Sequence, residues 1–148
     1  MLSASGGRTT GKEEMVLCAD DDADILRMLD VALECCGYEA ILAHDGKQAV
    51  DEFRKNKNNI VAVIMDLRMP VMNGFDAARQ IRAEAPGILL IALSAYLGLS
   101  KDGIQAKQCE EAGFNAWTTK PFSIEPLVEI IRSHTSKQAG TSGLQPKP

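Results

Sequence analysis

Short runs typical of β-strands alternate five times with helical patterns along this chain of 148 residues, and no other feature restricts the fold as strongly. Each run is too short for a helix, and each is followed by a segment with apolar side chains at helical spacing. Strands that alternate with helices predict a parallel sheet covered on both faces, which is the α/β class. The predicted strands are residues 15–19, 38–43, 60–65, 88–93 and a short polar run at 115–119.

The polarity of each run predicts its place in the sheet. The runs at 15–19, 60–65 and 88–93 are apolar throughout, as is typical of central strands buried on both faces. The runs at 38–43 and 115–119 contain polar residues and suit the two edges. With right-handed crossovers, these constraints favour one doubly wound (βα)5 domain with the strand order 2-1-3-4-5. This order places a topological switch point, where α/β sheets bind ligands, between the first and third strands.

The two ends of the chain differ from its middle in composition. Residues 1–13 and 135–148 are rich in Ser, Gly and Thr and bury too little apolar surface to offset the entropy of ordering. We therefore expect disordered tails or linkers at 1–13 and 135–148, and one folded domain at 14–134.

Charge and cysteine content exclude several classes of function. Sixteen Lys and Arg against twenty Asp and Glu give a net charge of -4, which argues against direct nucleic-acid binding. No apolar run reaches the ~18 residues of a membrane span, and no signal peptide is evident, so we expect a cytoplasmic protein. The four cysteines form no CxxC pair, which indicates reduced thiols and not a metal or disulfide framework.

Residues whose side chains could together carry out chemistry follow four of the five predicted strands. Asp20 and Asp21 follow the first run, Asp66 the third, Ser94 the fourth and Lys120 the fifth. Because the carboxyl ends of parallel strands meet at one edge of a sheet, we expect three carboxylates, one hydroxyl and one ammonium to converge there.

This set of groups is suited to phosphoryl transfer. Clustered carboxylates repel one another and favour a cation, and oxygen ligands without imidazole or thiolate favour Mg²⁺. Lys120 would add a second positive charge, and the hydroxyl of Ser94 could donate a hydrogen bond to a phosphoryl oxygen. Asp66 is placed to act as the nucleophile and form an aspartyl phosphate.

Four segments, VLCADDDADILRML, MDLRMPVMNGFDAARQIR, ALSA and TTKPF, resemble the signature segments of response regulator receiver domains. These are the CheY-like phosphoacceptors of two-component signalling. The resemblance covers residues 14–134, and it implies a flavodoxin-like fold.

The resemblance also implies roles for residues around the metal. Asp20 and Asp21 match the acidic pair, with Asp21 the more direct ligand, and Asp66 matches the phosphoacceptor. Arg68 matches the position whose backbone carbonyl also binds the metal, expected to be Mg²⁺ with Mn²⁺ as a substitute. Asp22 is a third acid in the row, so the register of the metal-binding pair stays open at this stage.

Further roles concern the switch. Ser94 matches the switch Ser/Thr, Lys120 matches the family's lysine, and Trp117 falls where the family has its switch aromatic, although Trp is bulkier than the common Tyr or Phe. The Lys120–Pro121 bond is expected to be cis. The stretch between Ser94 and Lys120 is longer than is common in the family.

The function implied is that of a phosphoacceptor and not of a turnover enzyme. A histidine kinase or a histidine phosphotransfer protein would donate the phosphoryl group to Asp66, and the face formed by helix 4, strand 5 and helix 5 would then change. Arg68 and Tyr96 offer no carboxylate or amide to orient water, so slow autodephosphorylation is expected.

The output partner would be an effector protein or a covalently attached output domain, and a homodimer formed on phosphorylation stays open. The linker-like ends favour a domain excised from a hybrid kinase or a larger regulator over a stand-alone regulator. The alternative is an unphosphorylated pseudo-receiver that serves as an interaction module. An aspartyl-nucleophile hydrolase is disfavoured, because Arg68 stands where its general acid would be.

Overall fold

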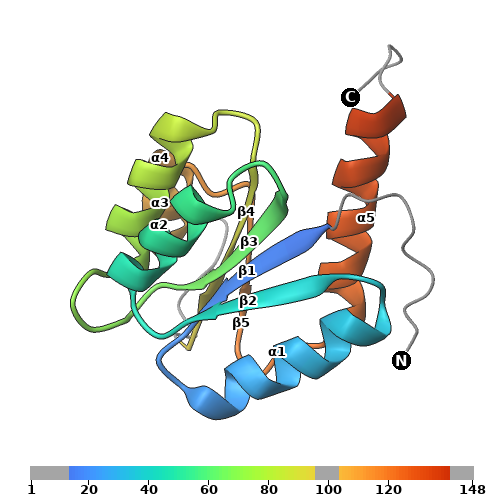
Figure 1. Ribbon diagram of the computed structural model, residues 1–148. Coiled ribbons are helices and arrows are strands. Elements are labelled where there is room, and N and C mark those ends of the chain that lie inside the picture. The colour runs from blue at the N-terminus through green and yellow to red at the C-terminus, as the bar shows by residue number, and fades with distance from the viewer. Residues whose placement is uncertain (1–13, 96–103, 141–148) are drawn as a thin grey trace.

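One parallel sheet lies between two layers of helices (Figure 1). The structure is a computed structural model that describes residues 14–95 and 104–140. The strands are β1 (Met15–Ala19), β2 (Glu39–Ala43), β3 (Ile60–Asp66), β4 (Leu89–Ser94) and β5 (Ala116–Thr119). The helices are α1 (Ala23–Cys35), α2 (Gly46–Lys55), α3 (Gly74–Glu84), α4 (Ile104–Ala112) and α5 (Ile124–Gly140).

The strand order is β2-β1-β3-β4-β5 and all neighbours are parallel, which confirms the predicted fold class and topology. The three apolar strands β1, β3 and β4 occupy the centre, and the two more polar strands form the edges. The sheet therefore has its switch point between β1 and β3, the two strands that precede the acidic residues.

Each central strand contributes alternately to two separate cores. Along β1, Leu17 faces the core under α2, α3 and α4, whereas Val16 and Cys18 face the core under α1 and α5. Figure 1 shows these two groups of helices on opposite faces of the sheet. Burial on both faces explains why the central strands are apolar at every position.

Local signals determine where the helices begin and end. The side chains of Asp22, Asp45 and Asn73 accept hydrogen bonds from backbone N–H groups in the first turns of α1, α2 and α3. Gly37 and Gly113 follow α1 and α4 with φ of 93° and 103°, which a residue without Cβ adopts at low cost.

The C-terminal helix continues past the predicted domain boundary. α5 ends at Gly140, so the expectation of a disordered segment starting at residue 135 is wrong for 135–140. Thr135 Oγ1 donates to the carbonyl of Ile131 at 2.8 Å, and extending an existing helix adds one backbone bond for each residue ordered. The expectations for 1–13 and 141–148 lie outside the described residues.

Two further expectations are that the cysteines are reduced thiols and that no segment spans a membrane. All four cysteines are free thiols, two of them buried, whereas Cys35 is exposed and Cys36 half-buried. Among the described residues, no helix combines the length and apolarity that crossing a bilayer requires.

Candidate functional site

The acidic residues gather where β1 and β3 end side by side. In the ladder between these strands Ala19 pairs with Met65, so Asp20, directly after β1, and Asp66, the last residue of β3, lie at the same level. Asp21 follows in the loop that leads to α1. Carboxylate oxygens of Asp20, Asp21 and Asp66 all lie within 4.8 Å of one another. The structure thus brings together three groups that the sequence placed at this edge.

The carboxylates differ in their exposure to solvent. Asp20 is fully buried, and Asp66 is 5% exposed. Asp21 lies at the surface beside them. The pocket is therefore deep on the side of Asp20 and open on the side of Asp21.

Lys120 reaches this pocket from the far edge of the sheet. Its Nζ lies 2.8 Å from Asp20 Oδ2 and 3.4 Å from Asp66 Oδ1. Its backbone N–H donates to the carbonyl of Ser94 at 2.8 Å, and the peptide bond to Pro121 is cis, as expected. The end of β4 and the start of the β5–α5 loop are thereby joined at the pocket.

Asp22, the third acid in the row, has a different position. Its side chain caps α1 by accepting from the N–H of Asp24 at 2.9 Å, and its own N–H donates to Asp20 Oδ1 at 2.9 Å. The carboxylates of Asp20 and Asp21 thus cluster with that of Asp66, whereas Asp22 lies outside this cluster; that Asp20 and Asp21 form the metal-binding pair stays a prediction.

Burial and repulsion perturb the titration of the site. The pKa of Asp66 is raised to about 6; burial is the largest cause, the neighbouring carboxylate of Asp20 also raises it, and the ammonium of Lys120 opposes both. Burial alone would lower the pKa of Lys120, but its contacts with the two carboxylates raise it overall. The lysine therefore remains an ammonium at neutral pH.

The donor set fits a hard divalent cation. In the described part of the chain, three carboxylates face the ammonium of Lys120, and the buried oxygen Asp20 Oδ2 has that ammonium at 2.8 Å and no other polar partner. An oxygen-only cluster that contains excess negative charge is the kind of site that Mg²⁺ occupies in proteins. The residues present therefore suit Mg²⁺.

Ser94 and Trp117 lie on the last two strands of the sheet, β4 and β5. Ser94 is the final residue of β4 and is 3% exposed. Trp117 is a half-buried residue of β5 that packs against the core under α2, α3 and α4. Tyr96 lies outside the described residues.

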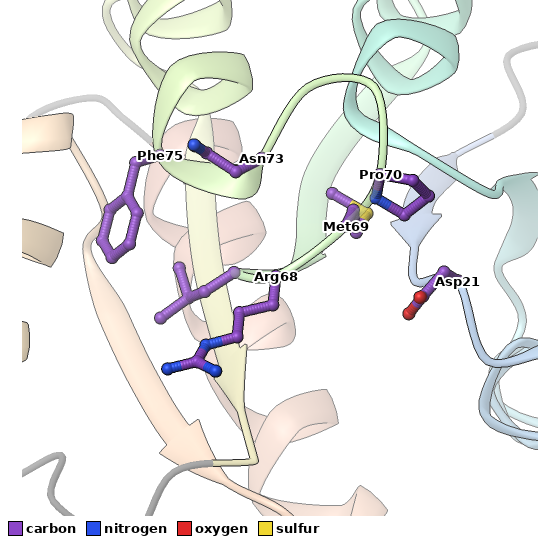
Figure 2. Close-up of a pocket in the computed structure, with 7 residues that line it drawn as sticks. Asp21, Arg68, Met69, Pro70, Asn73 and Phe75 are labelled. Carbon is purple, nitrogen blue, oxygen red and sulfur yellow. The ribbon is translucent and has the colours of Figure 1, made fainter.

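A groove of about 560 Å³ opens next to the acidic pocket. Figure 2 shows Asp21, Met69 and Pro70 on one side of it, Phe75 on the other, and Arg68 between them. Its lining residues are Asp21, Leu67, Arg68, Met69, Pro70, Asn73 and Phe75. Sequence analysis did not identify this groove, because its shape depends on how the loop from β3 to α3 folds back.

Two glycines hold that loop, and sequence analysis missed both. A Cβ on Gly74 would lie 2.2 Å from the backbone oxygen of Asp66, and a Cβ on Gly46 would lie 2.1 Å from that of Met72. The Asn-Gly pair at 73–74 is a turn signal that points to such a position. Gly46 has a similar signal in Asp45-Gly46, but nothing in the sequence indicates its partner.

Comparison with known proteins assigns this fold and pocket to a family. Residues 16–132 match the model of the response regulator receiver domain, so the chain belongs to this family of two-component signalling. It is 36% identical over 124 residues to the "probable transcriptional regulator ycf27" of Porphyridium aerugineum, covering 82% of this chain and 48% of that protein. The chain thus spans about half the length of this relative.

Solved structures agree with the assignment. A response regulator receiver domain protein from Clostridium thermocellum superposes with a TM-score of 0.76 at 26% identity, covering 85% of this chain and 97% of that one. The CheX–CheY–BeF3–Mg complex from Borrelia burgdorferi gives a TM-score of 0.73 at 27% identity, covering 84% and 90%. Both likenesses extend over nearly the whole described chain.

Proposed function

We propose that this receiver domain is a phosphoacceptor in which Asp66 takes a phosphoryl group from a histidine kinase or a histidine phosphotransfer protein. One observation supports this above all others: the ammonium of Lys120 contacts both Asp20 and Asp66, beside the open carboxylate of Asp21. This arrangement provides a nucleophile, a fixed positive charge and a cation site within one small pocket.

In the proposed reaction a carboxylate oxygen of Asp66 attacks phosphorus. The P–O bond forms as the P–N bond of the phosphohistidine breaks, and the departing imidazole nitrogen keeps the electron pair and takes a proton from solvent. Lys120 stabilises the negative charge of the phosphoryl oxygens. Since the donor supplies a high-energy bond, the chain's task is to position the groups and neutralise their charge.

Asp20, Asp21, Asp66 and the backbone carbonyl of Arg68 would hold Mg²⁺. When bound, the ion supplies neutralising charge to the carboxylates and the incoming phosphoryl group. The CheX–CheY–BeF3–Mg complex from Borrelia burgdorferi, which is similar in fold, includes Mg²⁺ and supports this choice.

The output would come from a change of surface. A phosphoryl group on Asp66 would attract the hydroxyl of Ser94 and the ammonium of Lys120, and Trp117 would follow on β5. We propose that the face formed by α4, β5 and α5 changes in this way and is read by an effector protein or an attached output domain.

The proposal is tested with acetyl phosphate and Mg²⁺, followed by intact-mass measurement. The wild-type chain should gain about 80 Da, the mass of one phosphoryl group. Asp66→Asn should gain nothing, excess EDTA should prevent the gain, and Asp22→Asn is the matched control that should react normally. A wild-type chain that stays unmodified would contradict the proposal and favour an interaction module that works without phosphorylation.

A further inference from the structure

Val71 has a backbone conformation that valine rarely adopts. Among the described residues it is the one non-glycine residue with φ in the left-handed region, at 70°. The N–H of Met72 donates to the carbonyl of Pro70 at 2.7 Å, which makes Val71 the centre of a three-residue γ-turn. A β-branched side chain is strained in this turn.

The surrounding chain imposes this turn. The carbonyl of Met72 accepts from the N–H of Gly46 at 3.0 Å, at a contact that only a residue without Cβ allows. On the other side, the N–H of Gly74 donates to the carbonyl of Leu67 at 2.9 Å. The loop is therefore held at both ends, and the strain falls on the residue between them.

The side chain of Val71 buries little of its surface inside the molecule. It is 78% exposed, more than the two other large exposed apolar residues of the described chain, Val31 at 59% and Met28 at 40%. Glycine or asparagine would adopt the same φ at lower cost and leave no apolar group in water. A strained and solvated valine therefore points to a contact outside the chain.

The position of Val71 indicates what that contact is. The residues just before it, Met69 and Pro70, form one side of the groove together with Asp21 (Figure 2). A protein that brings a phosphorylated imidazole to Asp66 has to cover this opening, because the carboxylate itself is 5% exposed at the bottom of the pocket.

We infer that Val71 is an apolar anchor for the protein phosphodonor, which would present an apolar patch beside its phosphohistidine. The inference rests on the proposed function and adds a specificity contact to it. Small phosphodonors, which enter the pocket without covering its surroundings, gain nothing from this side chain. Transfer from a protein donor therefore depends on both docking and chemistry, whereas transfer from a small donor reports on the chemistry alone.

The test compares Val71→Thr and Val71→Gly with the wild type. Threonine keeps the shape and the backbone strain but replaces a methyl group by a hydroxyl, whereas glycine removes both strain and side chain. The protein donor is the radiolabelled histidine kinase that transfers fastest to the wild type in a profile of purified kinases. The small donor is acetyl phosphate with Mg²⁺.

With the kinase, we expect kcat/KM for transfer to fall about tenfold in both variants, as when an interface anchor is truncated. With acetyl phosphate, both rates should stay within about twofold of the wild type. Thermal melting should show Val71→Gly to be at least as stable as the wild type, because relief of strain offsets the added freedom of the unfolded chain.

Three results would overturn the inference. Unchanged transfer from the kinase would show that the donor does not contact Val71, and equal losses with both donors would show that the loop acts by shaping the pocket. If acetyl phosphate labels the wild type but no kinase does, the chain has no protein phosphodonor among the kinases, and Val71 cannot be its anchor. Failure of the proposed function can be distinguished from these three results, because the wild type would then accept no phosphoryl group even from acetyl phosphate.

Discussion

At the scale of single residues, the pocket combines carboxylates that repel one another with the ammonium of Lys120, which attracts them. Asp66 is buried beside Asp20, and the ammonium of Lys120 opposes the repulsion between them. The pocket costs stability as long as no divalent ion is bound, because carboxylates in a poorly solvated site disfavour their charged forms. Such conflicts are common where a protein prepares a site for a ligand.

The raised pKa of Asp66 predicts a specific dependence of stability on pH. A folded-state pKa of about 6, above the ordinary value of 3.8, means that the folded chain binds more protons than the unfolded chain between these values. Asp66 should therefore reduce the free energy of unfolding as pH rises from about 4 to 6. Asp66→Asn, which cannot ionise, should lack this loss.

The measurement is urea unfolding in EDTA across this pH range. The stability difference between Asp66→Asn and the wild type should grow with pH and become constant above about 7. A difference that does not change with pH would show that the carboxyl of Asp66 titrates at its ordinary pKa.

The exposed side chain of Arg68 leads to a prediction about the lifetime of the phosphorylated state. A guanidinium has no acceptor that could take a proton from an attacking water, so autodephosphorylation should be slow. Arg68→Glu, which supplies a carboxylate at the same position, should shorten the lifetime. The decay of the added mass after removal of acetyl phosphate measures the lifetime of the phosphorylated state in the wild type and in Arg68→Glu. A wild-type half-life of seconds in Mg²⁺ would contradict the prediction.

The chemistry-bearing residues were predictable from the sequence to different degrees. Asp20, Asp66 and Lys120 each follow a predicted strand, and the topology of a parallel sheet places such residues at the same edge. Val71 could not be predicted, because valine favours extended backbone and its φ is imposed by contacts with distant residues. Positions that contradict local preference are where such reasoning fails, and they are often functional.

At the scale of secondary-structure elements, Arg82 connects α3 to the end of the sheet opposite the pocket. Its guanidinium donates to the backbone carbonyls of Pro86 at 2.8 Å, Ile88 at 2.6 Å and Gly113 at 3.1 Å. It also donates to Asn115 Oδ1 at 2.8 Å, and that oxygen accepts from the backbone of β4 as well. The ends of α3 and α4 are thus joined through one side chain.

Loss of this connection should destabilise the fold. Arg82→Ala leaves several half-buried carbonyl groups without donors, and we expect it to lower the free energy of unfolding by about 2–4 kcal/mol. Arg79→Ala on the same helix is the matched control, because its ion pair with Asp76 is exposed and should contribute less than about 1 kcal/mol. Similar losses in urea unfolding of the two variants would show that the connection is not structural.

The order of the elements was predictable, but one boundary was not. Hydrophobic pattern and right-handed crossovers together determined which strands are central, and the structure has that arrangement. The end of α5 was placed too early, because polar residues such as Thr135 and Ser136 resemble a linker in composition yet can extend a helix that is already anchored by buried residues.

At the scale of the whole molecule, the pocket links the fold to its ligand. Its groups come from the ends of β1, β3 and β5, so an ion bound there contacts several parts of the sheet at once. The unfolded chain cannot assemble this set of ligands. Binding should therefore stabilise the folded state specifically.

We expect Mg²⁺ to raise the melting temperature of the wild type by several degrees, because a ligand at 100 times its Kd adds about 2.7 kcal/mol to folding. Asp21→Asn removes one carboxylate from the open side of the pocket and should abolish most of this effect. Asp22 lies outside the cluster, and Asp22→Asn keeps a side chain that can cap α1. Mg²⁺ should therefore raise the melting temperature of this variant as much as that of the wild type. Equal responses of both variants would place the ion elsewhere.

The contact between Lys120 and Asp20 joins residues that lie one hundred positions apart in the chain. During translation, the first acidic residues leave the ribosome long before the lysine does. A nascent chain that ends within β4 consequently contains all three carboxylates but not yet the ammonium of Lys120. The domain should become reactive only once its last strand has emerged, so that synthesis itself delays the first signal until folding is nearly complete.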